Sequence, residues 1–349
     1  MNWHSSERLD TFRYTAVDRQ TLNDTVLLED IQDGGSISFN SLTALKVSAS
    51  VPYLGQLELK NDFLRIYSIS ELHGESETVV HGTFIASTPD SVLTDAAVTG
   101  TAQLYSLLLL LQRRRVGTAL TVEAGTNAVS FAASLVRSVG LPVVSDASSA
   151  SLNLPKAYDG GLTYLEVVND LLQFAGFKSL GIDGWGNSLM QTYRDPSEVT
   201  PSVTFRAGPG STFAPQASHT LDIFEVPNRL TLVCSRPDQV PLVAVAQNDD
   251  PENRYSTISR GEVIDAEPEE VDDIPSLKAL QELAKAKLAA KTSAVESLAI
   301  THSYEPFSMD DGCLVEYAGL RFQGIIVSSD ISLSPGMLTG TKVRRFVRF

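Results

Sequence analysis

The chain has 349 residues, of which 43% are hydrophobic and 20% are charged, and its formal net charge at pH 7 is -15. At about 150 residues per domain this length predicts two or three folded domains, and the composition excludes an intrinsically disordered chain. So acidic a surface repels phosphate and argues against a nucleic-acid-binding protein. The two cysteines, Cys234 and Cys313, are too few for a disulfide framework or a cysteine zinc site.

Residues 1–98 have the pattern of β-strands. Apolar and polar residues alternate in four runs: GSISFN (35–40), LKVSASV (45–51), FLRIYSIS (63–70) and TVVHGTFIAS (78–87). Turns rich in Gly, Asn, Asp and Pro separate these runs, and a period of two indicates strands with one buried face. The sequence predicts a first β domain over residues 1–98, with His81 on the surface of its strand.

The pattern changes near residue 99. The stretch TALTVEAGTNAVSFAASLVRSVGLPVV (118–144) indicates strand, turn, helix and strand, and we expect Thr126 to cap this helix. In LTYLEVVNDLLQFAG (162–176) apolar residues recur at helical spacing until Gly176 ends a second helix. The sequence therefore predicts a small α+β domain over residues 99–198.

Two short runs, KSLGID (178–183) and NSLMQTY (187–193), read as strands that close this domain. The turn between them consists of Asp183, Gly184, Trp185 and Gly186. Asp-Gly is a preferred hairpin turn because it tolerates positive φ angles. The stretch lacks the alternating oxygen ligands of a calcium loop. We therefore expect the glycines to serve the chain reversal and Trp185 to pack on a neighbouring surface.

After Pro196 and Pro201 the strand pattern returns, and we expect a second β domain over residues 199–349. An acidic loop and a helix interrupt it near 265–292, and Asp272 and Asp273 precede the helix, where carboxylates stabilise the positive end of the helix dipole. The predicted apolar stripe of this helix consists of Leu277, Leu280, Ala284 and Leu288. Such a stripe packs either on its own domain or on a neighbouring subunit.

The sequence contains no motif that predicts catalysis, and we expect no catalytic, cofactor-binding or metal-binding residues and no enzymatic activity. A nucleophile elbow, a phosphate-binding lysine motif and an HExxH zinc motif are all absent from the sequence. The apolar run Leu107–Leu111 is far shorter than the roughly 20 residues that cross a bilayer, so we expect no stable membrane insertion. The start, MNWHSSERLD, lacks the pattern of a secretory signal.

The order of these parts resembles that of the tail hub, minor tail or baseplate hub proteins of long-tailed bacteriophages. Several stretches carry the resemblance: VEAGTNAVSFAASLVRSVGL (122–141), the segment 158–193 from YDGG to MQTY, the segment 226–261 from VPNR to ISRG, LAKAKLAAKTS (283–293), and the segment 309–336 from MDDG to LSPG. None of them is a short diagnostic motif; their order along the chain supports the comparison.

The resemblance implies two tail-tube-like β-barrel domains that flank the small α+β domain. It also implies a homotrimer at the distal tail tip of the virion, synthesised in the cytoplasm of the host bacterium. Such a trimer adapts a sixfold tail tube to threefold fibres or a spike. Its expected partners are distal tail or tail-tube proteins, the tape-measure protein, and tail fibre or spike proteins. DNA would pass through its lumen without specific binding.

Two other functions stay open. A receptor- or carbohydrate-binding tail module would use exposed aromatic residues, and the candidates are Trp3, Trp185 and Tyr193. A wall-degrading enzyme would need carboxylates or histidines that converge in a cleft. The net charge has two interpretations as well: an acidic lumen wall that does not bind DNA, or a surface that keeps the protein soluble.

Overall fold

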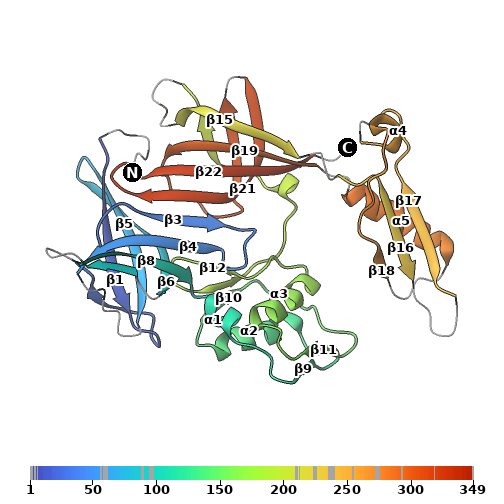
Figure 1. Cartoon of the computed structure of the whole chain (residues 1–349), viewed down its shortest axis with the longest axis horizontal. Coiled ribbons are helices and arrows are strands. Elements are labelled where there is room, and N and C mark those ends of the chain that lie inside the picture. The colour runs from blue at the N-terminus through green and yellow to red at the C-terminus, as the bar shows by residue number, and fades with distance from the viewer. Residues whose placement is uncertain are drawn as a thin grey trace. The chain divides into compact units, whose positions relative to one another are not determined.

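The structure is a computed structural model of the chain. It describes residues 3, 5, 7–55, 57, 62–87, 90–93, 98–208, 211, 213–222, 226–234, 240–253, 255–271, 276–291, 294–317 and 319–347. The chain divides into two compact units (Figure 1). The first unit consists of Met1–Ala217 and Ile300–Lys342, and the second of Ser218–Ala299 and Val343–Phe349. The predicted division at residues 98 and 198 stays a prediction.

One large sheet of 14 strands dominates the structure. Its strands are β1 (Leu9–Val17), β2 (Asp24–Leu27), β3 (Gly35–Asn40), β4 (Val47–Leu54), β5 (Phe63–Leu72), β6 (Glu75–Ala86), β7 (Asp90–Leu93), β8 (Val98–Ser106), β14 (Pro201–Arg206), β15 (Phe213–Asp222), β19 (Ala294–Ser303), β20 (Gly312–Tyr317), β21 (Leu320–Leu333) and β22 (Leu338–Val347). The prediction of a mostly β protein is confirmed.

The strand order joins the two ends of the sequence. Neighbouring strands follow the order β15-β19-β22-β21-β3-β4-β8-β6-β5-β1-β2, while β7 pairs with β8, and β14 and β21 both pair with β20. Among the described residues, the end strands of this path, β15 and β2, do not pair with each other, so the sheet does not close into a barrel. Antiparallel pairing of β21 with β3, from Ser328 opposite Asn40 to Leu333 opposite Gly35, connects the strands near the C-terminus to those near the N-terminus.

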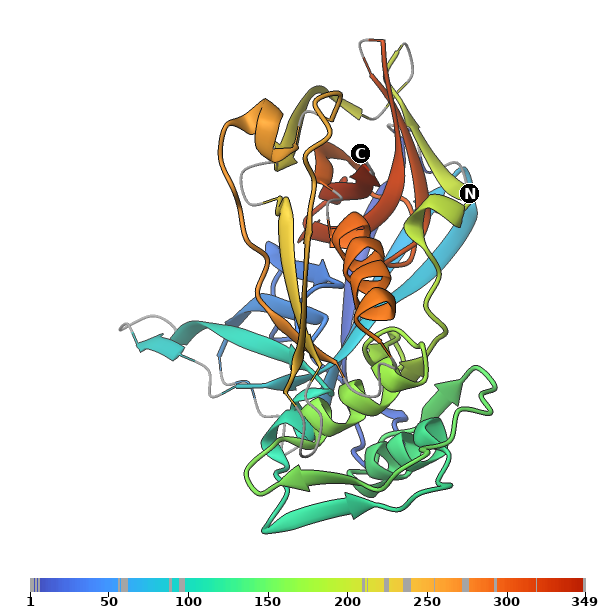
Figure 2. The same ribbon diagram turned by 90° about the vertical axis from the view of Figure 1, so that its right-hand side faces the viewer.

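The α+β segment lies in the first unit. Its elements are α1 (Leu109–Arg113), β9 (Ala119–Val122), α2 (Ala128–Ser138), β10 (Val143–Ser145), β11 (Lys156–Asp159), α3 (Tyr164–Phe174), β12 (Gly181–Ile182), β13 (Ser188–Met190) and the 3-10 turn η1 (Pro196–Glu198). Helices α2 and α3 pack against each other (Figure 2). Their core cluster also contains Val17, Phe63 and Ile85 from β1, β5 and β6, so the segment shares its core with the sheet.

Helices α2 and α3 both begin at capping side chains. Asn127, not Thr126, caps α2: its side chain accepts a hydrogen bond from the Ser130 backbone N–H. The prediction of Thr126 was wrong by one residue because Asn127 is the residue with extended backbone before the first helical turn. Helix α3 begins with a reciprocal capping box between Thr163 and Glu166.

The second unit contains a smaller sheet with the order β17-β16-β18. Its elements are β16 (Arg229–Cys234), β17 (Leu242–Gln247), α4 (Thr257–Arg260), β18 (Glu269–Val271) and α5 (Leu277–Lys291). Helix α5 packs on this sheet through Leu280, Ala284 and Leu288, which lie in one core cluster with Leu230 and Leu232 of β16. The apolar stripe therefore packs within its own unit.

Leu277, the first residue of α5, is 44% exposed and lies outside this core cluster. Of the four residues predicted to form the stripe, the structure therefore buries only Leu280, Ala284 and Leu288. Asp272 and Asp273, which were expected to stabilise the start of the helix, lie outside the described residues.

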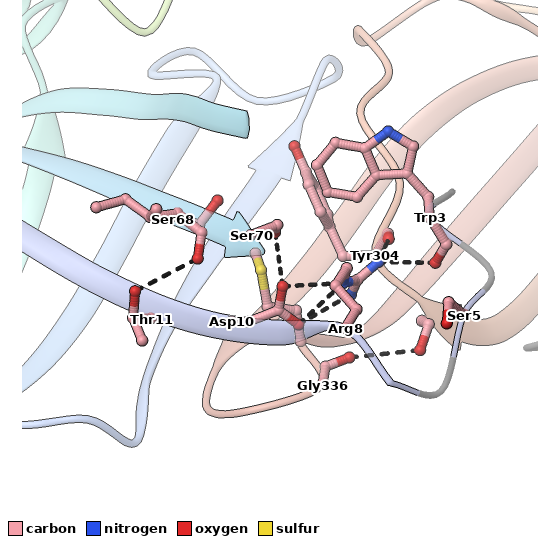
Figure 3. Close-up of polar contacts among 12 residues, drawn as sticks. Trp3, Ser5, Arg8, Asp10, Thr11, Ser68, Ser70, Tyr304 and Gly336 are labelled. Atoms are coloured by element: carbon pink, nitrogen blue, oxygen red, sulfur yellow. Dashed lines mark hydrogen bonds and ion pairs between the residues drawn. The ribbon is translucent and has the colours of Figure 1, made fainter. Parts of the chain in front are cut away.

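A buried ion pair joins the N-terminal segment to the C-terminal strands (Figure 3). The Nε of Arg8 lies 2.9 Å from Oδ1 of Asp10, and both side chains are almost fully buried. Arg8 Nη1 also donates to the backbone carbonyls of Trp3 (2.7 Å) and Tyr304 (2.8 Å), while the Ser70 hydroxyl donates to Asp10 at 2.6 Å. Each buried charge thus has partners that compensate its desolvation.

His81 on β6 is only 5% exposed, so the prediction of a surface position is wrong. The register between β5 and β6 shifts at this point: Ile66 pairs with Gly82 and Tyr67 with Val80, which leaves His81 as the extra residue of a bulge. The Tyr304 ring packs against the imidazole at 5.3 Å, and Nε2 lies 2.8 Å from the Ser68 hydroxyl. Burial lowers the pKa of His81 to about 4.

Replacement of His81 by Gln should weaken the pH dependence of stability. The pKa of His81 falls from its ordinary 6.5 to about 4 on folding, so between these values the unfolded chain binds a proton that the folded chain does not. The wild-type free energy of unfolding should therefore be fully present above pH 6.5 and decrease as the pH falls to about 4, by about 2–3 kcal/mol from this residue.

Urea titrations at about pH 7 and about pH 4.5 measure this difference. The matched control is His73→Gln, since the His73 side chain is 73% exposed and its ion pair with Glu7 lies at the surface, where such pairs contribute little to stability. Equal pH dependence in the His81→Gln variant and the wild type would show that the prediction is wrong.

Candidate functional site

Four neighbouring strands of the first unit present a polar surface, which we call the serine face. It consists of Ser328, Asp330 and Ser332 of β21, Ser36, Ser38 and Asn40 of β3, Ser48, Ser50 and Pro52 of β4, and Thr99, Thr101, Gln103 and Tyr105 of β8. Figure 1 shows β21, β3 and β4 side by side.

The strand register aligns these side chains in rows across the sheet. One row contains Asp330, Ser38, Ser48 and Tyr105, and the next contains Ser332, Ser36, Ser50 and Gln103. Between them runs a row that points into the core, formed by Ile331, Ile37, Ala49 and Leu104, all of which are buried. Alternation along each strand therefore makes one side of the sheet apolar and the other hydroxyl-rich.

The serine face carries almost no charge. Asp330 is its only ionisable acid or base apart from the phenol of Tyr105, and Ser38 donates a hydrogen bond of 2.6 Å to its Oδ1. Gln103 Nε2 donates to the Ser50 hydroxyl at 3.3 Å. No Lys or Arg belongs to this face, so it offers phosphate no ion pair and releases no condensed counterions. Short hydroxyl side chains instead bind water.

The four residues predicted to form a turn lie between β12 and β13. Asp183 and Asn187 pair through the backbone, and the Asp183 carboxylate accepts from the Asn187 backbone N–H at 2.8 Å. Gly186 has a φ of 92°, a value that favours glycine. Gly184 lies against β6 so closely that an added Cβ would come within 2.2 Å of the Val80 carbonyl oxygen.

The buried side chain of Arg65 connects this turn to the sheet. Arg65 is 1% exposed and lies on β5. Its Nε donates to the Thr83 hydroxyl at 2.8 Å, and its Nη2 donates to the carbonyls of Leu22 (2.9 Å) and Trp185 (3.2 Å). Its Nη1 pairs with Asp24 at 2.7 Å. The Thr83 hydroxyl in turn donates to the Gly184 carbonyl at 2.9 Å.

Trp185 itself is 53% exposed, so most of its surface does not pack as the sequence predicted. Its ring packs edge to face with Tyr67, with centroids 6.2 Å apart, and the Arg65 guanidinium lies 4.9 Å from its centroid. The Tyr67 hydroxyl donates to the second carboxylate oxygen of Asp24, and burial is the main reason that the pKa of Tyr67 is raised. The ring borders a hollow of about 640 Å³.

The other predicted aromatic candidates lie in different surroundings. Trp3 packs against Tyr304 with ring centroids 5.8 Å apart, whereas Tyr193 is 56% exposed and borders a separate hollow with Phe177 and Lys178. The structure therefore does not bring Trp3, Trp185 and Tyr193 together into one aromatic surface.

Metal-ligating side chains do not cluster in the part of the chain that the structure describes. No group of three or more His, Cys, Asp or Glu side chains among those residues is arranged to hold a metal ion. Cys234 and Cys313 are buried and unbridged, and burial raises the pKa of Cys313 to about 12. Within the same residues, no helix combines the length and apolar character needed to cross a bilayer.

Sequence reasoning missed both the serine face and Arg65. The alternating serines of GSISFN and LKVSASV were a visible signal, but periodicity alone does not say that these strands are neighbours or that β21 continues their rows. Arg65 lies in the strand FLRIYSIS and has no local signal, because its partners come from residues 22, 24, 83 and 185.

Comparison with solved structures connects this architecture to known proteins. A tail protein from Neisseria meningitidis MC58 superposes with a TM-score of 0.65 at 13% identity and covers 96% of this chain and 97% of its own. The 43 kDa tail protein of prophage MuSo2 from Shewanella oneidensis superposes with a TM-score of 0.64 at 12% identity, over 96% and 98%. This chain has the fold of phage tail proteins.

The same tail-protein fold is similar to part of a longer chain. A chain of the Francisella PdpA–VgrG complex superposes with a TM-score of 0.56 at 10% identity, and the match covers 97% of this chain but only 58% of that one. No protein-family model and no curated protein sequence matches the chain. The likeness therefore concerns the fold.

Replacement of Gly184 by Ala should destabilise this tail-protein fold by about 1–3 kcal/mol, since the added Cβ would lie 2.2 Å from the Val80 carbonyl oxygen and the backbone would have to move. The matched control is Gly117→Ala, because no atom lies within 4 Å of an added Cβ there and the φ is not positive. Urea unfolding of the three proteins measures the difference. Equal midpoints for both variants would contradict the close approach.

Proposed function

We propose that this chain is a structural virion protein that forms a homotrimeric hub at the distal tip of a phage tail. The observation that carries this proposal is the fold shared with two phage tail proteins over 96% of the chain. In this role the hub adapts the sixfold tail tube to threefold fibres or a spike and forms part of the DNA channel. It has no enzymatic activity of its own.

The two β regions support this assignment. In our proposal residues 1–98 and 199–349 each contribute one tail-tube-like barrel, and residues 99–198 form the α+β insert. Three chains with two such regions present six similar units, which is the number needed to match a sixfold tube. Expected partners are distal tail or tail-tube proteins, the tape-measure protein, and fibre or spike proteins.

We further propose that the serine face lines the channel. Duplex DNA carries about one negative charge per 1.7 Å of its axis, and a wall with Lys or Arg would bind it through counterion release. The serine face has no cation and a single carboxylate, Asp330. It thus carries almost no charge, whereas one interpretation of the sequence was an acidic wall, and a hydrated wall with so little charge equally avoids holding the DNA.

Cryo-electron microscopy of particles that contain this chain tests the hub assignment. We expect three copies around the channel at the distal end of the tail tube, with β3, β4, β8 and β21 facing the axis. Density for the chain only on peripheral appendages would overturn the hub and favour a receptor-binding module.

A substitution tests the channel wall separately. Ser36 and Ser50 face each other across β3 and β4, and the double variant Ser36→Lys, Ser50→Lys places two cations on the serine face. We expect slower, salt-dependent DNA release from particles that carry it, because lysines on the wall would pair with phosphates.

The matched control for this test places the same charges on helix α2, at the exposed residues Ser130 and Ser134. Release from control particles should equal that from wild type. Equal release from all three kinds of particle, once their assembly is verified, would contradict the proposal that the serine face lines the channel.

A further inference from the structure

A hollow that is largely open to solvent lies beside Trp185. It lies on the first unit and is lined by Arg13, Asn23, Asp24, Tyr67, Thr78 and Trp185. Its volume of about 640 Å³ lies within the range of about 300 to 1,000 Å³ that is usual for ligand sites. The proposed hub function does not use these residues.

Trp185 is held rigidly although it is exposed. Arg65 binds its carbonyl and lies over its ring, Tyr67 packs against the ring edge to face, and Gly184 leaves no space between the turn and β6. An exposed aromatic ring that is fixed before a ligand arrives loses little conformational entropy on binding. The partly negative face of the ring attracts the polarised C–H groups on one side of a ligand ring, such as a sugar.

The charges of the hollow do not cancel. Both carboxylate oxygens of Asp24 already have partners within the protein: one pairs with Arg65 at 2.7 Å, and the other accepts from the Tyr67 hydroxyl. Arg13 is exposed on β1, its guanidinium lies 4.3 Å from the Tyr67 ring centroid, and no carboxylate of the described residues pairs with it. The hollow therefore presents one uncompensated cation in a chain of net charge -15.

The remaining lining groups are neutral and polar. Asn23 and Thr78 are both exposed and supply an amide and a hydroxyl. An amide both donates and accepts hydrogen bonds, as does a hydroxyl, so the pair suits the hydroxyl groups of a sugar. Arginine, in contrast, presents a planar fork of donors that matches a carboxylate.

We propose that this hollow binds a saccharide that carries a carboxylate, with one sugar ring on the indole of Trp185 and the carboxylate on Arg13. The rigid ring supplies the stacking surface, Arg13 supplies the charge, and Asn23 and Thr78 bind the hydroxyl groups. The site belongs to a single chain and does not depend on the trimeric hub, so the two proposals succeed or fail separately.

Titration calorimetry with two matched pairs of sugars tests the site. The first pair is 3'-sialyllactose and lactose, and the second is trigalacturonic acid and galactotriose. We expect at least one acidic sugar to bind the wild-type chain about tenfold more tightly than its neutral partner, as one charge-assisted contact would provide. Added salt should reduce this difference.

Two variants separate the contributions of charge and stacking. Arg13→Gln should abolish the preference for the acidic sugar, and Trp185→Leu should weaken binding about tenfold or more. The control variant is Tyr193→Leu, which removes another exposed aromatic ring outside the hollow and should bind as the wild type does. Thermal unfolding of each variant verifies that it is folded.

Three results would overturn the proposal: neither acidic sugar binds more tightly than its neutral partner, Arg13→Gln keeps the full preference, or Trp185→Leu binds as tightly as Tyr193→Leu. Loss of sugar binding in a chain that still forms a threefold hub in particles would leave the proposed function intact.

Discussion

The buried guanidinium of Arg65 is the interaction on which most of the first unit depends. A cation that is 1% exposed is tolerated only when its donors have partners, and those partners come from distant parts of the chain. Asp24 neutralises it from β2, Thr83 accepts from β6, and the Trp185 carbonyl accepts from the hairpin of the α+β segment. Removal of any one partner leaves a buried donor unsatisfied, so sheet and hairpin are stable only together.

A second buried cation has a similar effect at the other end of β1. Arg8 pairs with Asp10 and donates to the carbonyl of Tyr304, which follows β19. Together with the pairing of β21 and β3, this contact makes the N-terminal and C-terminal segments parts of one structure. Unfolding of either segment would expose the same core, so we expect the first unit to unfold cooperatively.

The chemistry of the two surfaces differs although the same sheet carries them. The serine face carries almost no charge, is hydrated and is made of short side chains. Such a surface can contact DNA without binding it tightly. The hollow beside Trp185 combines a rigid ring with Arg13, which pairs with no carboxylate of the described residues, and such a site is suited to retention of a ligand. In the proposed hub, the serine face would let DNA pass and the hollow would hold a saccharide.

The sequence by itself determined many local elements: strands such as β3, β4, β5 and β6, helices α2 and α3, and the turn at Asp183–Gly186. These follow from periodicity, capping residues and turn preferences, which act between residues close in the chain. The tertiary structure alone decided that β3 lies beside β21, that His81 is buried in a bulge, that Leu277 and Trp185 are exposed, and that Arg65 is satisfied. Periodicity specifies which residues share a face, but the neighbour of each strand depends on contacts between residues hundreds of positions apart.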